Sequence, residues 1–125
     1  MTHAIVTGAN GFVGSAVGKE LLRNDVQVCA VVHNGHSDNL PDASNLHIVS
    51  CDLAEISQLP AKLPLSDYDI FYHLAWAGSA GPERANTSLQ LQNAQWTVEA
   101  LQAAKEVGCQ RFICAGSIME HETIA

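Results

Sequence analysis

Three glycines near the amino terminus have a spacing that is typical of a phosphate-binding loop. Gly8, Gly11 and Gly14 follow the short apolar run at residues 3–6 and precede a helical pattern of apolar residues. A dinucleotide-binding loop requires this order of strand, glycine turn and helix, because the helix points free N–H groups and the positive end of its dipole at the phosphates. We therefore predict a pyrophosphate-binding turn. The alternative is a turn that only joins a strand to a helix.

Each glycine has its own physical reason in such a loop. Gly8 permits the tight turn out of the strand, Gly11 lets the backbone approach a pyrophosphate, and Gly14 lets the helix pack closely on the sheet. The residues between the glycines belong to the same predicted cofactor-binding segment, namely Asn10, Phe12 and Val13.

Short apolar runs alternate with helical patterns along the whole chain. Strands are expected at residues 3–6, 26–32, 46–50, 68–74 and 111–114. Helices are expected at about 11–23, 55–63 (interrupted by Pro60) and 88–107, with Gly108 as a C-terminal cap. The apolar positions that predict the last helix are Leu91, Ala94, Val98, Leu101 and Ala104. This alternation predicts an α/β fold with a doubly wound parallel sheet of about five strands in the order 3-2-1-4-5.

Ligands of such a sheet bind at the carboxyl ends of its strands. His33 follows the second strand, 19 residues after Gly14, where a carboxylate would bind the ribose hydroxyls of NAD and a basic residue the extra phosphate of NADP. At neutral pH a histidine offers neither a carboxylate nor a permanent positive charge. We therefore predict weak discrimination between the two cofactors, with some tolerance of NADP. A loop histidine without a function is the alternative.

The string Thr-Gly-Ala-Asn-Gly-Phe-Val-Gly at residues 7–14 resembles the short-chain dehydrogenase/reductase superfamily, and most of all its extended branch of nucleotide-sugar epimerases and dehydratases. Segments similar to the same family follow in the family's order at residues 73–77, 93–97 and 111–117. The resemblance covers nearly the whole chain and implies a Rossmann-type domain that binds NAD or NADP. It also implies hydride transfer on a nucleotide sugar or a related alcohol or carbonyl substrate.

The resemblance assigns roles to residues at three further strand ends. Asp52 and Leu53 would contact the adenine, with capping of the next helix as the alternative for Asp52. The cofactor would be lined by Leu74, Ala75, Trp76 and Ala115. Trp76 is larger than its counterpart in the family, and its ring would either wall the nicotinamide side or pack under the loop.

The predicted helix at residues 88–107 also matches the family. Asn93 would brace the active-site strand or contact the cofactor. The resemblance implies a homodimer through this helix, and Trp96 on it belongs either to the core or to that interface.

The fifth strand leads to Ser117, the candidate catalytic hydroxyl, which would donate a hydrogen bond to a substrate oxygen. Capping of the next helix is the alternative for Ser117. The family's catalytic pair is a tyrosine with a lysine four residues later, and neither Tyr68 nor Tyr72 has that spacing. We therefore expect the 125 residues to be the N-terminal cofactor half of a longer enzyme, inactive alone and without the substrate-binding part. A module that senses NAD(P) or a nucleotide without turnover is the alternative.

Composition limits the other classes of function. The net charge of −7 disfavours nucleic acid as a partner, and no apolar run approaches the ~20 residues of a membrane span. The four cysteines and six histidines lack the spacing of a zinc site, so no metal is expected. Reduced thiols and the absence of a signal-peptide pattern favour a cytoplasmic protein.

Overall fold

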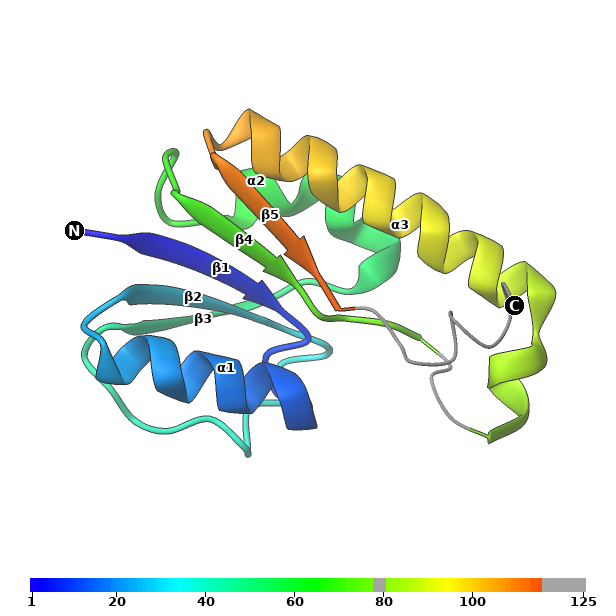
Figure 1. The fold of residues 1–125 in the computed structure, drawn as a ribbon, viewed down its shortest axis with the longest axis horizontal. Coiled ribbons are helices and arrows are strands. Elements are labelled where there is room, and N and C mark those ends of the chain that lie inside the picture. Colours follow the sequence, from blue (N-terminus) through cyan, green and yellow to red (C-terminus); the bar gives the residue numbers. More distant parts are fainter. Residues whose placement is uncertain (78–80, 116–125) are drawn as a thin grey trace, which may run out of the picture.

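The computed structural model describes residues 1–77 and 81–115, and its centre is a parallel sheet of five strands in the order β3-β2-β1-β4-β5 (Figure 1). The strands are β1 (His3–Thr7), β2 (Gln27–Val32), β3 (Leu46–Ser50), β4 (Ile70–His73) and β5 (Arg111–Cys114). The predicted fold class and strand order are confirmed. The third and fifth strands have the predicted limits, whereas the fourth is shorter than the predicted run at residues 68–74.

Helices cover both faces of the sheet, as a doubly wound topology requires. Figure 1 shows α1 (Phe12–Arg23) on one face, with α2 (Leu59–Lys62) and α3 (Thr87–Glu106) on the other. Two 3₁₀ helices, η1 (Leu53–Gln58) and η2 (Gly81–Ala85), complete the described elements. The single helix predicted at residues 55–63 is thus two short ones. Pro60 lies in the first turn of α2, where a missing N–H breaks no helical hydrogen bond.

The sheet buries side chains on both of its faces. On the α3 face, Ile5 pairs with Cys29 of β2 and Phe71 of β4, and all three belong to one buried cluster. On the α1 face, Val6 and Ala30 form a second cluster with leucines from α1. This explains why β1 and β2 are nearly continuous apolar runs: a strand covered on both faces has no solvent-facing side.

The face of α3 that packs on the sheet differs from the one its apolar spacing suggests. Of the five apolar positions that predicted this helix, only Ala104 is buried, whereas Leu91 and Val98 are 67% and 50% exposed. The buried residues of α3 are Asn93, Ala100, Ala103 and Ala104. Small side chains let the helix lie close to η1 and β4, and Trp96 packs against the same core, which supports the core alternative for it.

Both edges of the described sheet carry exposed apolar side chains. Ile113 on β5 is 42% exposed and Ile48 on β3 is 43% exposed. β5 and β3 are the two edge strands of the described sheet. Within residues 1–77 and 81–115, none of the helices has the length and hydropathy needed to cross a bilayer.

Candidate functional site

The predicted site residues converge where β1 and β4 end. The connection after β1 returns through α1 to β2 on one side, whereas β4 and β5 continue the sheet on the other side. The order in which strands are added to the sheet therefore reverses between β1 and β4. Ligands of open α/β sheets bind at such a switch point. The glycine loop follows β1, and the segment 74–77 follows β4.

Two of the three glycines are required by close packing inside the protein. Gly8 has a φ of +64°, and a Cβ on it would lie 2.8 Å from the backbone nitrogen of Ala75. A Cβ on Gly14 would collide with the carbonyl oxygen of Gly8 and lie 2.7 Å from its carbonyl carbon. These glycines thus hold the turn, the start of α1 and the end of β4 in contact.

Gly11 has a different role from the other two. It is exposed, its φ of −77° suits any residue, and its Cβ would approach only the carbonyl oxygen of Gly8, at 3.2 Å. It is also the N-cap of α1 and forms no side-chain cap, so the first-turn N–H groups have no side-chain acceptor. This open, uncapped helix start fits the pyrophosphate of a dinucleotide.

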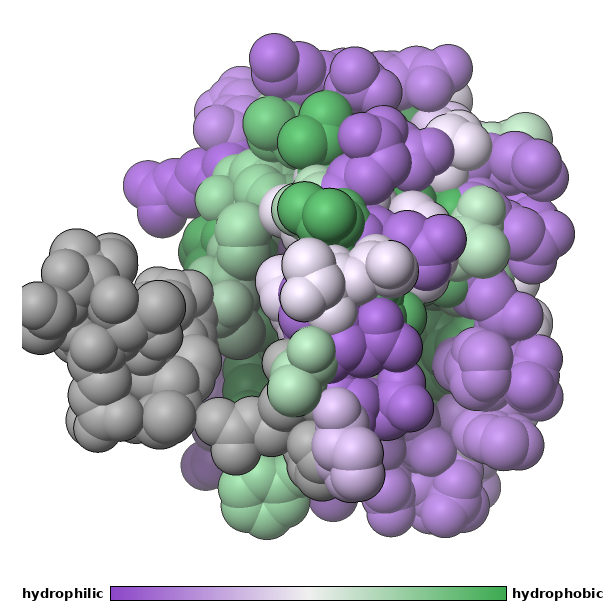
Figure 2. All heavy atoms as spheres, turned by 90° about the vertical axis from the view of Figure 1, so that its right-hand side faces the viewer, coloured by the Kyte–Doolittle hydropathy of each residue, from purple (hydrophilic) through white to green (hydrophobic). Residues whose placement is uncertain are grey.

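The first turn of α1 also presents apolar side chains to solvent. Phe12 is 94% exposed and Val13 is 53% exposed. Figure 2 shows the end of the molecule that faces right in Figure 1, where hydrophobic residues gather in the upper centre and left of the view and hydrophilic residues lie at the top and right. A ligand at the helix start therefore has both N–H groups and apolar surface within reach.

A buried polar network joins β1 to β4 directly behind the glycine loop. The Thr7 hydroxyl oxygen accepts hydrogen bonds from the N–H groups of Leu74 and Ala75, at 3.0 and 3.2 Å. Its own proton therefore goes to Nδ1 of His73, 2.8 Å away, which leaves the ring proton on Nε2. Burial lowers the pKa of His73 to about 4, so this imidazole is neutral at pH 7 and serves as a structural acceptor.

Asn93 on α3 braces the segment that follows β4. Its side-chain amide donates to the carbonyl of Ala77 at 2.7 Å and its oxygen accepts from the N–H of Ala77 at 3.0 Å. Asn93 is buried, and its amide also donates to Gln90. Trp76 is exposed over the start of α3, and its indole N–H donates to Gln90 at 2.9 Å. These contacts match the bracing role considered for Asn93, and its contact with the cofactor stays a prediction.

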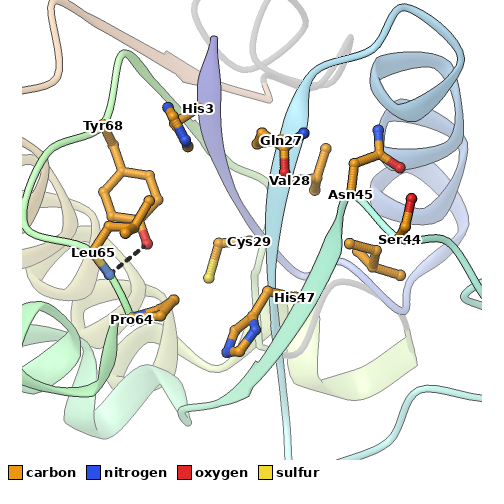
Figure 3. Close-up of a pocket in the computed structure, with 11 residues that line it drawn as sticks. His3, Gln27, Val28, Cys29, Ser44, Asn45, His47, Pro64, Leu65 and Tyr68 are labelled. Atoms are coloured by element: carbon orange, nitrogen blue, oxygen red, sulfur yellow. Dashed lines mark hydrogen bonds between the residues drawn. The ribbon is translucent and has the colours of Figure 1, made fainter. Parts of the chain in front are cut away.

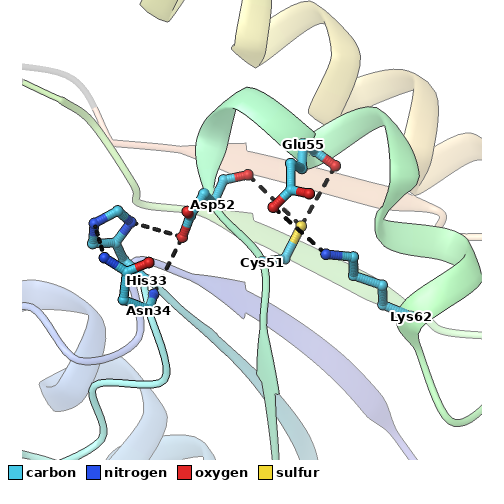
Figure 4. Close-up of polar contacts among 6 residues, drawn as sticks. All are labelled: His33, Asn34, Cys51, Asp52, Glu55 and Lys62. Carbon is cyan, nitrogen blue, oxygen red and sulfur yellow. Dashed lines mark hydrogen bonds and ion pairs between the residues drawn. The ribbon is translucent and has the colours of Figure 1, made fainter.

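His33 and Asp52, considered separately in the sequence, form one polar pair (Figure 4). Nδ1 of His33 lies 2.8 Å from Oδ1 of Asp52, and Nε2 of His33 lies 3.1 Å from the side-chain amide of Asn34. Oδ1 of Asp52 also accepts from the Asn34 N–H at 3.2 Å. The Asp52 side chain does not cap η1, so the capping alternative for it is wrong.

The loop after β2 folds back onto the glycine loop. Asn10 donates through its side-chain amide to Oδ1 of Asp38, at 2.9 Å. Asn39 donates two hydrogen bonds to Asn10, both at 2.8 Å. The backbone N–H of Asn39 donates to the side-chain oxygen of Asn10, and the side-chain amide of Asn39 donates to the backbone oxygen of Asn10. The side chain of Asn10 thus ties two loops together across 28 and 29 residues.

The remaining predicted site residues lie at strand ends. Leu53, Leu74 and Ala75 are half-buried there, and Ala115 is exposed just after β5. Ser117 lies outside the described residues. The sequence analysis missed Thr7, Asp38 and His73 as site-forming side chains. Thr7 and His73 end adjacent parallel strands, and this register could have been used to pair them.

A cavity of about 230 Å³ lies at the opposite end of the sheet, near the amino ends of β1, β2 and β3 (Figure 3). Its lining includes His3, Cys29, His47 and Tyr68. Burial raises the pKa of the Cys29 thiol to about 12 and that of the Tyr68 hydroxyl to about 12, so both groups are protonated at neutral pH. This cavity is thus separate from the candidate site at the carboxyl ends of the strands, and Cys29 is not an activated nucleophile.

Across residues 1–77 and 81–115, no group of three or more His, Cys, Asp or Glu side chains could hold a metal ion.

Known proteins share this fold and sequence pattern. The chain is 30% identical over 118 residues to the dTDP-6-deoxy-L-talose 4-dehydrogenase (NAD(+)) of Aggregatibacter actinomycetemcomitans, covering 94% of this chain and 42% of that enzyme. An epimerase from Methanothermobacter thermautotrophicus superposes with a TM-score of 0.75 at 23% identity, covering 94% of this chain and 35% of that one. The Bordetella bronchiseptica enzyme WbmH in complex with NAD+ gives a TM-score of 0.66 at 26% identity, covering 90% and 37%.

These coverages mean that the chain spans less than half the length of the relatives it matches. The sequence profile of one family nevertheless matches almost all of it, from residue 4 to residue 122. The glycine loop, the uncapped start of α1 and the order of the strands are the features that a dinucleotide-binding member of that family needs. The chain belongs to the NAD dependent epimerase/dehydratase family.

Proposed function

We propose that the 125 residues form the cofactor-binding domain of an NAD(P)-dependent oxidoreductase that acts by hydride transfer on a nucleotide sugar or a related alcohol or carbonyl substrate. The observation that carries the proposal is the glycine loop, in which Gly8 and Gly14 are fixed by packing while Gly11 and the uncapped start of α1 stay open to a ligand. The similarity to a dehydrogenase named for a dTDP-linked sugar supports the substrate class.

Each part of the site has a proposed task. The first turn of α1 binds the pyrophosphate through its N–H groups. Asp52 and Leu53 lie at the end of β3, where they would contact the adenine. The segment 74–77, held by Asn93 and Thr7, lines the cofactor beside Trp76. The bound cofactor supplies the hydride chemistry, and we propose that the acid–base residues come from chain beyond these residues, with Ser117 assisting.

Replacing Gly11 by valine tests the cofactor assignment. We expect the fold to persist, because the φ of Gly11 is ordinary and its side is exposed, while NAD(P) affinity falls at least about tenfold, since a branched side chain projects beside the N–H groups. Calorimetric titration of both cofactors, with circular dichroism as the folding check, measures this. Equal affinity for wild type and variant would remove the loop from the site.

A module that binds NAD(P) without turnover is the second candidate. It is favoured by one observation: His73, at the end of β4, is held neutral by burial and hydrogen-bonded to Thr7, so it is not placed for acid–base work at pH 7. The reading frame separates the candidates, because the family resemblance requires a Tyr-x-x-x-Lys motif after residue 125 in an enzyme. Assay of the encoded full-length protein for substrate-dependent NAD(P)H formation gives the biochemical answer.

We also propose a homodimer through α3. The side of this helix away from the sheet carries an apolar stripe that is exposed to solvent in the single chain. The stripe is formed by Leu91, Ala94, Val98 and Leu101. Val98→Glu should shift a dimer toward monomer at micromolar concentration, because it places a charge at the centre of the stripe. Light scattering of the variant measures the shift. Gln92→Glu, an exposed change on another side of α3, should leave the mass unchanged, and a monomeric wild type would contradict the proposal.

The four cysteines support a cytoplasmic location, which we propose for the protein. All four are free thiols, with Cys114 exposed. Free, unpaired cysteines are the usual state in the reducing cytosol and unusual in secreted proteins.

A further inference from the structure

We infer that Asp38, rather than the residue at the end of β2, recognises the adenosine ribose and makes this protein prefer NAD over NADP. The inference rests on the proposed cofactor site and names the residue that selects between the two cofactors. It replaces the weak discrimination expected from His33 alone.

The side chain of His33 forms its polar contacts with residues outside the glycine loop. Both of its ring nitrogens have partners, Asp52 on one side and Asn34 on the other. Figure 4 shows the imidazole turned toward Asp52 at the end of β3. The ring thus belongs to the β3 side of the site and has no free nitrogen for a ribose hydroxyl.

Asp38 occupies the place beside the glycine loop. The amide of Asn10 holds Oδ1 of Asp38 at 2.9 Å, and Asn39 fixes the same stretch through its two hydrogen bonds to Asn10. Asn10 directly precedes Gly11, the N-cap of α1. The carboxylate is therefore held next to the pyrophosphate-binding turn, where a dinucleotide places its adenosine ribose.

The carboxylate is also free to bind. Asp38 is exposed, and in the part of the chain that the structure describes its carboxylate receives a side-chain hydrogen bond from Asn10 alone, through Oδ1. The hydrogen bond from Asn10 and one from the backbone N–H of Asp38 itself lower the pKa of Asp38, with a smaller contribution from the charge of nearby His36. An ionised carboxylate accepts hydrogen bonds from the 2′- and 3′-hydroxyls of NAD, whereas it repels the 2′-phosphate of NADP.

The charged groups around Asp38 decide at which pH to test the preference. His36 and His33 lie on the same loop, Asp52 follows β3, and Asp42 lies further along the loop. A protonated histidine would attract the 2′-phosphate and oppose Asp38. We therefore choose pH 8 for the test, where a positive charge from the loop competes least with the carboxylate.

Calorimetric titration of the full-length protein with NAD+ and with NADP+ at pH 8 tests the inference. We expect wild type to bind NAD+ at least about tenfold more tightly, the gain typical of a charge-assisted hydrogen bond. Asp38→Asn should bring the ratio of the two affinities close to one. Asp42→Asn, on the same loop but without a contact to Asn10, should keep the ratio of the wild type.

Asn10→Ala adds a second readout that a purely structural role of Asp38 would not give. Because Asn10 positions the carboxylate, Asn10→Ala and Asp38→Asn should each lower the ratio, and the double variant should lower it no further. A ratio unaffected by Asp38→Asn, or a preference for NADP+ in the wild type, would overturn the inference. Failure to bind either cofactor would instead overturn the proposed function.

Discussion

We expect Gly14→Ala to destabilise the protein by about 3 kcal/mol and to abolish cofactor binding. The added methyl group would collide with the carbonyl oxygen of Gly8 and lie 3.0 Å from the Cα of Ala9. Both neighbours are backbone atoms, so no side chain can rotate away to make room. The start of α1 must therefore move off the turn, and the N–H groups that face the pyrophosphate move with it. Urea denaturation measures the stability and calorimetry the binding.

Gly18→Ala is the matched control for this substitution. Gly18 lies one turn further along α1, and a Cβ there would have no neighbouring atom within 4 Å. Alanine is favoured over glycine inside a helix by up to about 1 kcal/mol, so this variant should be slightly more stable than wild type and bind cofactor normally. Equal effects of the two variants would show that the contact between Gly14 and Gly8 does not hold the loop.

The three glycines illustrate what a motif does and does not predict. Their spacing correctly indicated a turn between a strand and a helix, because the backbone contacts at Gly8 and Gly14 leave no room for a side chain. The sequence also indicated that Gly14 packs closely while Gly11 stays open. It did not predict that the backbone of Ala75 after β4, which is distant in sequence, forms the close contact at Gly8.

The strands were predictable for a related reason. A strand buried on both faces must be apolar along its length, so β1 and β2 stand out in the sequence. α3 was predictable as a helix but not in its orientation. Its large apolar residues point outward, and the face toward the sheet uses alanines, a buried asparagine and Trp96. Apolar periodicity indicates that a helix exists, whereas the side that is buried follows from which residues are small enough for close approach.

Polar side chains at the strand ends were only partly predictable. His33 and Asp52 lie at strand ends, where they were predicted, but their pairing with each other was not predicted. The pairing of Asn10 with Asp38 joins residues that are 28 positions apart. Such pairs depend on how a loop returns over the sheet. No propensity or spacing rule determines that path, which is why the position of Asp38 beside the glycine loop could not be predicted from the sequence.

Thr7→Val is the second change with a large expected effect, although the two side chains have nearly the same shape. The hydroxyl of Thr7 is the shared partner of three groups, the N–H of Leu74, the N–H of Ala75 and Nδ1 of His73. Valine fills the space but offers none of them a partner, and a buried unpaired polar group costs about 1–3 kcal/mol. We expect a loss of about 3 kcal/mol in the free energy of unfolding, because Thr7 and His73 are almost completely buried.

Thr97→Val makes the same chemical change where little depends on it. The hydroxyl of Thr97 only donates to the carbonyl of Asn93 one turn earlier in α3, a bond that adds little to helix stability. The free energy of unfolding of this variant should therefore stay within about 0.5 kcal/mol of that of the wild type.

Nitrogen NMR of His73 supplies an independent readout. The wild type should show the proton on Nε2 at pH 7, and the Thr7 variant should lose this fixed tautomer, because valine donates no hydrogen bond to Nδ1. If Thr7→Val costs no more than Thr97→Val, or if His73 carries its proton on Nδ1 in the wild type, then the hydroxyl of Thr7 does not hold the end of β4 against the glycine loop.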